Sequence, residues 1–249
     1  MHAAGLTDKG KVREQNEDTI FCTSEPYGPL PNLFIVADGM GGHNAGEVAS
    51  KEAVTQITDY LRSYSTPELV QPDNYLDLLV TAIQKANTKV CDMAGKKKHL
   101  KGMGTTMTAC VVTEDKIMLA HVGDSRAYFI SPDEITRLTT DHTYVGQMLA
   151  SGQITAEEAE IHPQRHVITR VLGVDTPPFE VDGHVLPLGD TVTILLCSDG
   201  LTNMIDDQKI KEIVNYVGLV EHRTQFLIEE ANLRGGHDNI SAILIDVKR

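Results

Sequence analysis

The sequence predicts an α+β fold: a four-layer αββα sandwich in which two antiparallel β-sheets pack face to face, with helices on their outer faces. Apolar runs typical of strands are mingled with hairpin turns and long amphipathic helices. A doubly wound parallel sheet would instead require regular strand–helix alternation. The 249 residues contain no repeat, low-complexity stretch or long Pro/Gly linker, so we expect a single domain spanning residues 1–249.

The first part of the chain predicts one buried strand and two long helices. The strand is the apolar run at residues 33–37, and a glycine-rich turn at residues 39–46 follows it. A helix is expected over residues 47–62, where apolar side chains recur at helical spacing. Asn74 is expected to cap a second helix. One face of that helix is apolar and carries Leu76, Leu79, Val80, Ile83 and Val90.

The chain after Gly104 is rich in predicted strands. These lie at residues 106–113, 117–121 and 126–130, with a turn at Glu114-Asp115 between the first two. The segment 141–173 is mixed, with short helical stretches at residues 145–150 and 156–160. A strand at residues 191–197, helices at 207–217 and 222–233, and a last strand at 240–247 complete the predicted order.

Charge and cysteine content exclude several classes of function. The formal net charge of −13 should repel nucleic acids and anionic membranes. The dense basic run at residues 96–101 is too short for a nucleic-acid groove, and we expect a solvated loop there. None of the four cysteines forms a Cys-x-x-Cys pair, which argues against zinc, and no disulfide framework is expected. Without an apolar signal stretch or a membrane-length segment, we expect a cytoplasmic protein that does not contact membranes.

Aspartates recur at the ends of the apolar runs. Asp38, Asp124 and Asp199 each follow such a run, Asp238 precedes the last one, and an acidic pair lies at residues 17–18. If the strands lie side by side, these carboxylates converge at the rim of a sheet and repel one another unless cations neutralise them. Oxygen ligands suit hard divalent ions such as Mg²⁺ or Mn²⁺. The pattern therefore predicts a multi-metal site that activates water against a phosphoester.

Each of these residues also has a structural interpretation when taken alone. Asp38 could lie in a tight strand–helix turn, Asp124 in a hairpin, and Asp238 in a loop or a helix cap. Arg13 could bind a phosphate through two hydrogen bonds, but taken alone its local sequence favours a surface ion pair with Glu17.

The order of the motifs turns these separate signals into a resemblance. The sequence resembles the metal-dependent PP2C-type (PPM) protein serine/threonine phosphatases, in their compact bacterial form. The motifs cover residues 13 to 239, which is nearly the whole chain. They are, in order, Arg13-x-x-Asn16-Glu17-Asp18, Asp38-Gly39-Met40-Gly41-Gly42-His43, Gly104-Thr105-Thr106, Gly123-Asp124-Ser125-Arg126, Asp141-His142-Thr143, Ser198-Asp199-Gly200 and Asp238-Asn239.

The resemblance implies a centre of two or three Mn²⁺ or Mg²⁺ ions at one end of the β-sandwich. It implies that Asp38 bridges two of the ions and that the carbonyl of Gly39 binds one of them. Asp199 and Asp238 would bind the other ion. Asp124, together with Asp199, matches a third metal position described in bacterial members of the family.

The resemblance also assigns the residues around the ions. Glu17 and Asp18 would hold water molecules of the centre, and Arg13 would bind the phosphate. Animal members carry a histidine directly after the Asp-Gly, proposed as the general acid. Here that position is Met40, and His43, three residues on, is the candidate instead. Residues 145–171 correspond to the flap, a variable segment beside the active site.

The implied function is hydrolysis of phosphoserine and phosphothreonine in proteins, with a Ser/Thr kinase among the substrates, by a monomeric enzyme. A phosphodiesterase or nuclease using the same metals is disfavoured by the acidic surface. A catalytically weak phosphatase fold acting as a scaffold would usually lack metal-binding aspartates, and none is missing here. A calcium-binding domain is disfavoured because the chain has no Asp-x-Asp-x-Asp-Gly loop.

Overall fold

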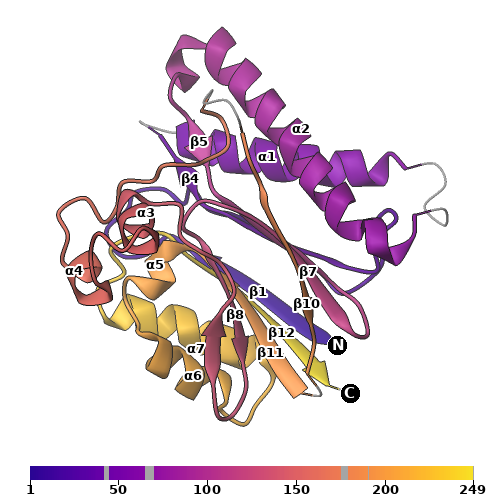
Figure 1. Cartoon of the computed structure of the whole chain (residues 1–249), viewed down its shortest axis with the longest axis vertical. Coiled ribbons are helices and arrows are strands. Elements are labelled where there is room, and N and C mark those ends of the chain that lie inside the picture. Colours follow the sequence, from indigo (N-terminus) through magenta and orange to yellow (C-terminus); the bar gives the residue numbers. More distant parts are fainter. Residues whose placement is uncertain (42–44, 65–69, 175–178, 190, 249) are drawn as a thin grey trace.

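Two five-stranded antiparallel sheets face each other in the computed structural model of the chain, and helices cover both outer faces (Figure 1). The structure describes residues 1–248 except 42–44, 65–69, 175–178 and 190. The predicted α+β sandwich is therefore confirmed. In the described part of the chain, no helix combines the length and the apolar character needed to cross a membrane.

The first sheet has the strand order β1-β12-β11-β8-β9 and the second has the order β10-β7-β6-β3-β2. The strands of the first are β1 (His2–Asp8), β12 (Ile240–Lys248), β11 (Thr191–Cys197), β8 (Arg126–Ile130) and β9 (Ile135–Arg137). Those of the second are β10 (Asp182–Pro187), β7 (Lys116–Val122), β6 (Met107–Val112), β3 (Leu33–Ala37) and β2 (Thr19–Thr23). A small two-stranded sheet pairs β4 (Gly39–Met40) with β5 (Gly104–Thr105).

The helices divide between the two faces in the way that a four-layer sandwich requires. α1 (Ala45–Arg62) and α2 (Tyr75–Lys96) lie over the second sheet, and short 3₁₀ turns, η2 (Pro72–Asn74) and η3 (Lys98–Leu100), flank α2. α5 (Asp199–Thr202), α6 (Asp207–Val214) and α7 (Val220–Leu233) lie over the first sheet. To one side of the two sheets, α3 (Tyr144–Ala150) and α4 (Ala156–Glu160) form a separate projection, on the left of Figure 1.

The alternation of side chains along β3 explains its uninterrupted apolar run. Phe34 and Val36 pack into the core between the two sheets, whereas Leu33, Ile35 and Ala37 pack into the core beneath α1 and α2. Both faces of this strand are therefore buried, so every residue on it is apolar. A strand of this kind ends at the rim of the sandwich, where Asp38 follows.

The main predicted elements are confirmed, with shifted ends. α1 begins two residues earlier than expected, at Ala45, and α6 ends at Val214 rather than at residue 217. β1, β2, β9 and β10 were not predicted, because their sequences are short or carry few branched aliphatic residues. The expectation for Asn74 is corrected: it precedes α2, but its side chain makes no capping hydrogen bond, because it already lies in the helical region at the end of η2.

Asn32 completes the pairing of β3 with β6 by means of its side chain. It is buried, its Nδ2 donates to the carbonyl of Val112 at 2.6 Å, and its Oδ1 accepts from the amide of Val112 at 2.8 Å. Asn32→Ala would leave both peptide groups buried and unpaired, so we expect the free energy of unfolding to fall by about 2–4 kcal/mol. Urea denaturation measures this change.

The control for this prediction is Asn215→Ala, which removes a solvent-exposed hydrogen bond of 2.9 Å to the carbonyl of Ser131. We expect that change to lower the free energy of unfolding by less than about 1 kcal/mol, because water replaces the lost partner. Equal losses in the two variants would contradict the structural role given to Asn32.

Candidate metal centre

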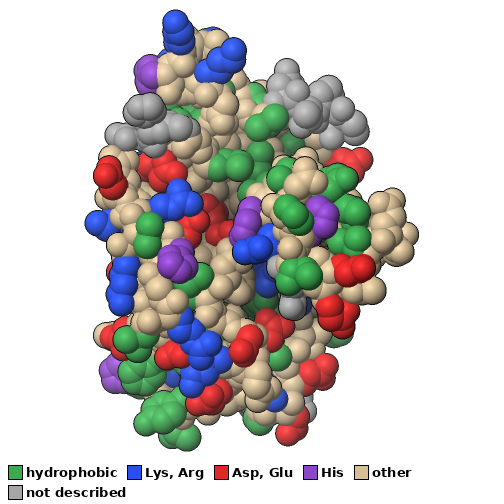
Figure 2. Space-filling model, turned by 90° about the vertical axis from the view of Figure 1, so that its left-hand side faces the viewer, with side chains coloured by type: hydrophobic (Ala, Val, Ile, Leu, Met, Phe, Trp, Pro, Cys, Tyr) green, Lys and Arg blue, Asp and Glu red, His purple; other side chains and the backbone are tan. Residues whose placement is uncertain are grey.

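Four of the predicted carboxylates lie where strands of both sheets end, on one side of the sandwich. Asp38 directly follows β3 and Asp124 lies just after β7, while Asp199 begins α5 after β11 and Asp238 lies just before β12. Burial, and then the charges of Asp18 and of the other three aspartates, hold the pKa of Asp38 well above its usual range. Figure 2 shows acidic side chains gathered in a hollow of this side of the molecule. The predicted convergence of the carboxylates is what the structure shows.

Asp18 is buried and is held by two serines. The hydroxyls of Ser198 and Ser241 donate to its Oδ2 at 2.8 and 2.6 Å. Its Oδ1 is buried without a hydrogen-bond partner among the described residues. Burial above all raises the pKa of Asp18 to about 7. This carboxyl group therefore requires either a proton or a nearby cation at neutral pH.

The backbone of Asp38 is held by the two threonines that follow Gly104. The amide of Thr106 and the hydroxyl of Thr105 both donate to the carbonyl of Asp38 at 2.9 Å, and the amide of Asp38 donates to Oγ1 of Thr106 at 2.9 Å. Burial raises the pKa of Asp199, and a hydrogen bond between its carboxyl group and that of Asp38 partly offsets this rise. Two carboxyl groups in such contact share one proton, whose place a cation can take.

Gly39 permits the close contact between the end of β3 and the start of α1. A Cβ atom on Gly39 would lie 2.2 Å from the carbonyl oxygen of Gly46 and 2.4 Å from that of Glu17, so only glycine fits. Burial raises the pKa of Glu17, and the backbone amides of Gly46 and Glu47 in the first turn of α1 partly offset this rise, since the helix dipole there favours negative charge. Oε1 of Glu17 is buried without a partner among the described residues.

Asp124 follows a residue whose backbone conformation requires glycine. Gly123 has a φ angle of +116°, and a Cβ atom there would lie 2.6 Å from the side chain of Thr106. The side chain of Asp124 is buried, and within the described part of the chain its Oδ1 has no hydrogen-bond partner. Burial, followed by the charge of Asp199, raises the pKa of Asp124 to about 8.

Arg13 lies at the edge of the carboxylate cluster and pairs with Asp238. Its Nη2 donates to Oδ2 of Asp238 at 2.7 Å. The alternative of an ion pair with Glu17 is therefore wrong. Burial acts to lower the pKa of Arg13, but the charge of Asp238, and to a smaller extent that of Glu17, raises it above its usual value. The side chain of Arg13 is 52% exposed, so a phosphate group in solution can reach it. Contact between Arg13 and phosphate stays a prediction.

The donor set fits hard divalent cations. The cluster offers carboxylate oxygens only, and three of them, on Glu17, Asp18 and Asp124, are buried without a hydrogen-bond partner among the described residues. In the part of the chain that the structure describes, no three His, Cys, Asp or Glu side chains already form a complete ligand set around one point. Backbone oxygens and water commonly complete the ligand set of such ions.

Sequence analysis missed the polar residues that hold these acids in place. Oδ1 of Asn239 accepts from the amide of Glu17 at 2.8 Å, and its Nδ2 donates to the carbonyls of Lys9 and Gln15 at 2.9 and 2.8 Å. Asn239 could have been found from the sequence, because it belongs to the Asp238-Asn239 motif. Ser241 could not, because a single serine within a predicted buried strand does not indicate a role at the site. His43, the predicted proton donor, lies outside the described residues.

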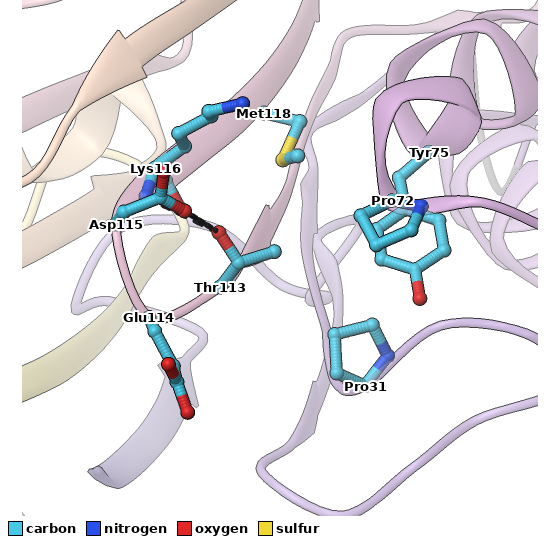
Figure 3. Close-up of a pocket in the computed structure, with 8 residues that line it drawn as sticks. All are labelled: Pro31, Pro72, Tyr75, Thr113, Glu114, Asp115, Lys116 and Met118. Carbon is cyan, nitrogen blue, oxygen red and sulfur yellow. Dashed lines mark hydrogen bonds between the residues drawn. The ribbon is translucent and has the colours of Figure 1, made fainter.

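A pocket of about 340 Å³ lies near the opposite end of β3, and Pro31 is one of the residues that line it. Figure 3 shows the rings of Pro31, Pro72 and Tyr75 along one side of it and the turn between β6 and β7 along the other. In that turn the hydroxyl of Thr113 donates to Asp115 at 3.1 Å. No residue predicted for the metal site lines this pocket, so the chemistry is placed at the carboxylate cluster.

Comparison with known proteins identifies the family to which this fold and carboxylate cluster belong. Residues 11–234 match the family described as protein phosphatase 2C. The chain therefore belongs to the protein phosphatase 2C family of metal-dependent protein phosphatases.

Similar proteins include both sequence relatives and solved structures. The chain is 38% identical to the serine/threonine phosphatase stp of Listeria innocua, over 99% of this chain and 96% of the relative. A crystal structure of a bacterial serine phosphatase superimposes with a TM-score of 0.91 at 34% identity, over 100% of this chain and 98% of that one. The catalytic domain of the phosphatase PstP, solved in complex with two manganese ions, has a TM-score of 0.84 at 32% identity, over 100% and 98% of the two chains.

The raised pKa values predict how the stability of the metal-free protein depends on pH. The pKa values of Asp18 and Asp124 are raised to about 7 and about 8 in the folded protein. In the unfolded chain an aspartate has a pKa of about 3.9. Between these values the folded state binds more protons, so the free energy of unfolding falls as pH rises through the folded pKa values. We expect a lower Tm in excess chelator at pH 8.5 than at pH 6.5.

The window lies above pH 6.5 because His121, whose pKa burial lowers to about 4, acts in the opposite direction at lower pH. The decline should be smaller in Asp124→Asn, which lacks one of the titrating groups. A Tm that stays constant or rises from pH 6.5 to pH 8.5 in chelator would show that burial and mutual repulsion do not raise the pKa values of these carboxyl groups.

Proposed function

We propose that this protein hydrolyses phosphoserine and phosphothreonine in proteins with a water molecule activated at a binuclear Mn²⁺ or Mg²⁺ centre, to which Asp124 adds a third position. The observation that carries the proposal is the convergence of the buried carboxylates, with three unpartnered oxygens, in a chain of the protein phosphatase 2C family. The complex of PstP with two manganese ions supports the choice of metal.

Asp38, Asp199, Asp238 and the carbonyl of Gly39 would hold the two principal ions, and Asp124 with Asp199 the third. When bound, such ions supply hydroxide near neutral pH by lowering the pKa of water. Glu17 and Asp18 would orient water through their unpartnered oxygens.

Arg13 would bind and orient the phosphate group. Its guanidinium can donate two parallel hydrogen bonds to phosphate oxygens and stabilise the charge that develops on them in the transition state. The present partner of Arg13, Asp238, is itself a predicted metal ligand. Neutralisation of Asp238 by a cation would weaken that ion pair and release Arg13 for the substrate.

The leaving serine or threonine oxygen needs a proton, because an alkoxide is a poor leaving group. Met40 cannot supply it, and His43 is our candidate among the side chains of the chain. The proposed substrates are phosphorylated proteins, including a Ser/Thr kinase, and the proposed enzyme is a monomer. All four cysteines are free thiols, which supports a reducing compartment such as the cytoplasm.

The test of the proposed function is hydrolysis of a phosphothreonine peptide with Mn²⁺, with Mg²⁺ and with excess chelator. We expect turnover only with a divalent ion. Asp38→Ala should abolish most of it, because the bridging ligand is lost. The same variant should be at least as stable as the wild type in chelator, since a repelling carboxylate is gone, and Mn²⁺ should raise its Tm less. Wild-type turnover in a preparation shown to contain no metal would refute the proposal.

Arg13→Ala tests the handling of phosphate separately from metal binding. Loss of a charge-assisted contact of about 1.5–3 kcal/mol predicts a roughly ten- to hundred-fold lower kcat/KM on the phosphothreonine peptide. Arg13→Lys keeps the charge but not the paired donors, so it should recover only part of the loss. Mn²⁺ affinity, measured by calorimetry, should change little. A collapse of metal binding with intact phosphate affinity would mean that Arg13 instead organises the carboxylates.

A further inference from the structure

His142 joins the segment that carries Asp124 to the base of the α3–α4 projection. We propose that His142 is a positioning residue: its imidazole holds the Gly123 peptide, and thereby sets the place of the Asp124 carboxylate in the metal centre. The inference rests on the proposed function, since the position of Asp124 matters for catalysis only there.

Both peptide groups of Gly123 bind the same residue. The amide of Gly123 donates to Nδ1 of His142 at 3.0 Å, and the carbonyl of Gly123 accepts from the amide of His142 at 2.7 Å. The side chain and the backbone of His142 therefore fix the peptide planes on either side of a left-handed glycine. Asp124 is the next residue, so its direction of approach depends on these two hydrogen bonds.

The contacts of His142 determine its tautomer. A backbone amide can only donate, so Nδ1 must be the acceptor and Nε2 must carry the proton. Nε2 then donates to Oδ2 of Asp182, on β10, at 3.0 Å. Burial, and the neighbouring charge of Arg170, lower the pKa of His142, and the neutral ring that this tautomer requires is favoured.

Asp182 is what keeps this tautomer in place. Nη1 of Arg170 donates to Oδ1 of Asp182 at 2.5 Å and lies 3.2 Å from Nε2 of His142. Arginine has no acceptor, so without Asp182 this guanidinium would donate to Nε2 and move the proton to Nδ1. A protonated Nδ1 faces the amide of Gly123 donor against donor, and the hydrogen bond to Gly123 would be lost.

The same residue anchors the projecting segment. The carbonyl of His142 accepts from the amide and the hydroxyl of Thr169, at 2.7 and 3.0 Å. Thr143, its neighbour, begins α3 by accepting from the amide of Gly146 at 3.0 Å. Both ends of residues 145–171, the predicted flap, therefore meet at His142. Movement of that segment would therefore change the position of Asp124 through the imidazole ring of His142.

A buried histidine with good hydrogen bonds could also serve stability alone. His121, fully buried, lies against His142 with ring centroids 4.9 Å apart, and its Nε2 donates to the carbonyl of Thr140 at 3.2 Å. The contact between the rings of His121 and His142 is the kind of packing that a purely structural role for His142 would require. The two roles differ in which nitrogen of His142 matters, because Nδ1 serves Gly123 and Nε2 serves Asp182.

Two substitutions by amide side chains distinguish the roles of the two ring nitrogens of His142. In His142→Asn, the side-chain oxygen can take the place of Nδ1 and accept from Gly123, whereas in His142→Gln the side-chain nitrogen can take the place of Nε2 and donate to Asp182. Asp182→Ala is a third variant at a partly exposed site, and His222→Gln, at an exposed position of α7, is the matched control. Amide hydrogen exchange of Gly123 is measured by NMR in the metal-free protein. Turnover of a phosphothreonine peptide and of an activated aryl phosphate is measured across a Mn²⁺ titration.

We expect the exchange of the Gly123 amide to rise roughly tenfold or more in His142→Gln and Asp182→Ala, but not in His142→Asn or His222→Gln. Turnover should fall in His142→Gln and Asp182→Ala because the third metal position is weakened. The peptide should lose roughly tenfold and the aryl phosphate less, because an activated leaving group scarcely needs a proton. More Mn²⁺ should also be needed for half-maximal peptide turnover.

Equal exchange and turnover in His142→Asn and His142→Gln would overturn the positioning role, and so would wild-type exchange of Gly123 in a folded Asp182→Ala. If His142→Gln fails to fold, Asp182→Ala decides the question by the same two measurements. If the wild type does not hydrolyse the phosphopeptide at all, the proposed function fails, but the exchange of Gly123 still decides whether His142 holds that peptide.

Discussion

Mutual repulsion among buried carboxylates at the rim of the sandwich is the constraint on which the rest of the structure depends. Asp18 and Asp124 are deeply buried, and Asp38 and Asp199 are close enough to share a hydrogen bond. No folded chain gathers such groups without compensation. Here the compensation is a set of local donors, raised pKa values and one arginine, and a divalent cation would replace the protons that the raised pKa values retain.

The surrounding fold serves to hold these acids at fixed separations. The two sheets bring together strand ends that are far apart in the sequence, so that β3, β7 and β11 deliver their aspartates to one place. Glycines allow the contacts that bulkier residues would prevent, as Gly39 does against Gly46. The first turn of α1 stabilises Glu17, and Ser198 with Ser241 stabilises Asp18. The centre therefore combines a hydrogen-bonded backbone at Asp38 with buried carboxylate oxygens that lack a partner among the described residues, which favours binding of small cations.

Sequence reasoning succeeded where one residue type has one physical meaning. The apolar run at β3 predicted a buried strand, and an aspartate directly after such a strand is expected at the rim of the sheet. It failed for β1 and β10, whose residues are mostly small or polar, because neighbouring strands rather than their own side chains make them strands. It failed for Asn74 because a 3₁₀ turn occupied the capping position. The partner of Arg13 was missed because Asp238 lies 225 residues away along the chain.

The sequence by itself determined the family, the sandwich and the set of acids, because apolar periodicity and short motifs are local properties of the chain. Only the tertiary structure decided which acids are buried, which of their oxygens lack a hydrogen-bond partner, and which ring nitrogen of His142 carries the proton. These properties depend on the distance and direction of groups brought together from separate strands, such as Gly123 and His142 or Asp18 and Ser241. Electrostatic energy depends on distance and burial, and local sequence contains neither.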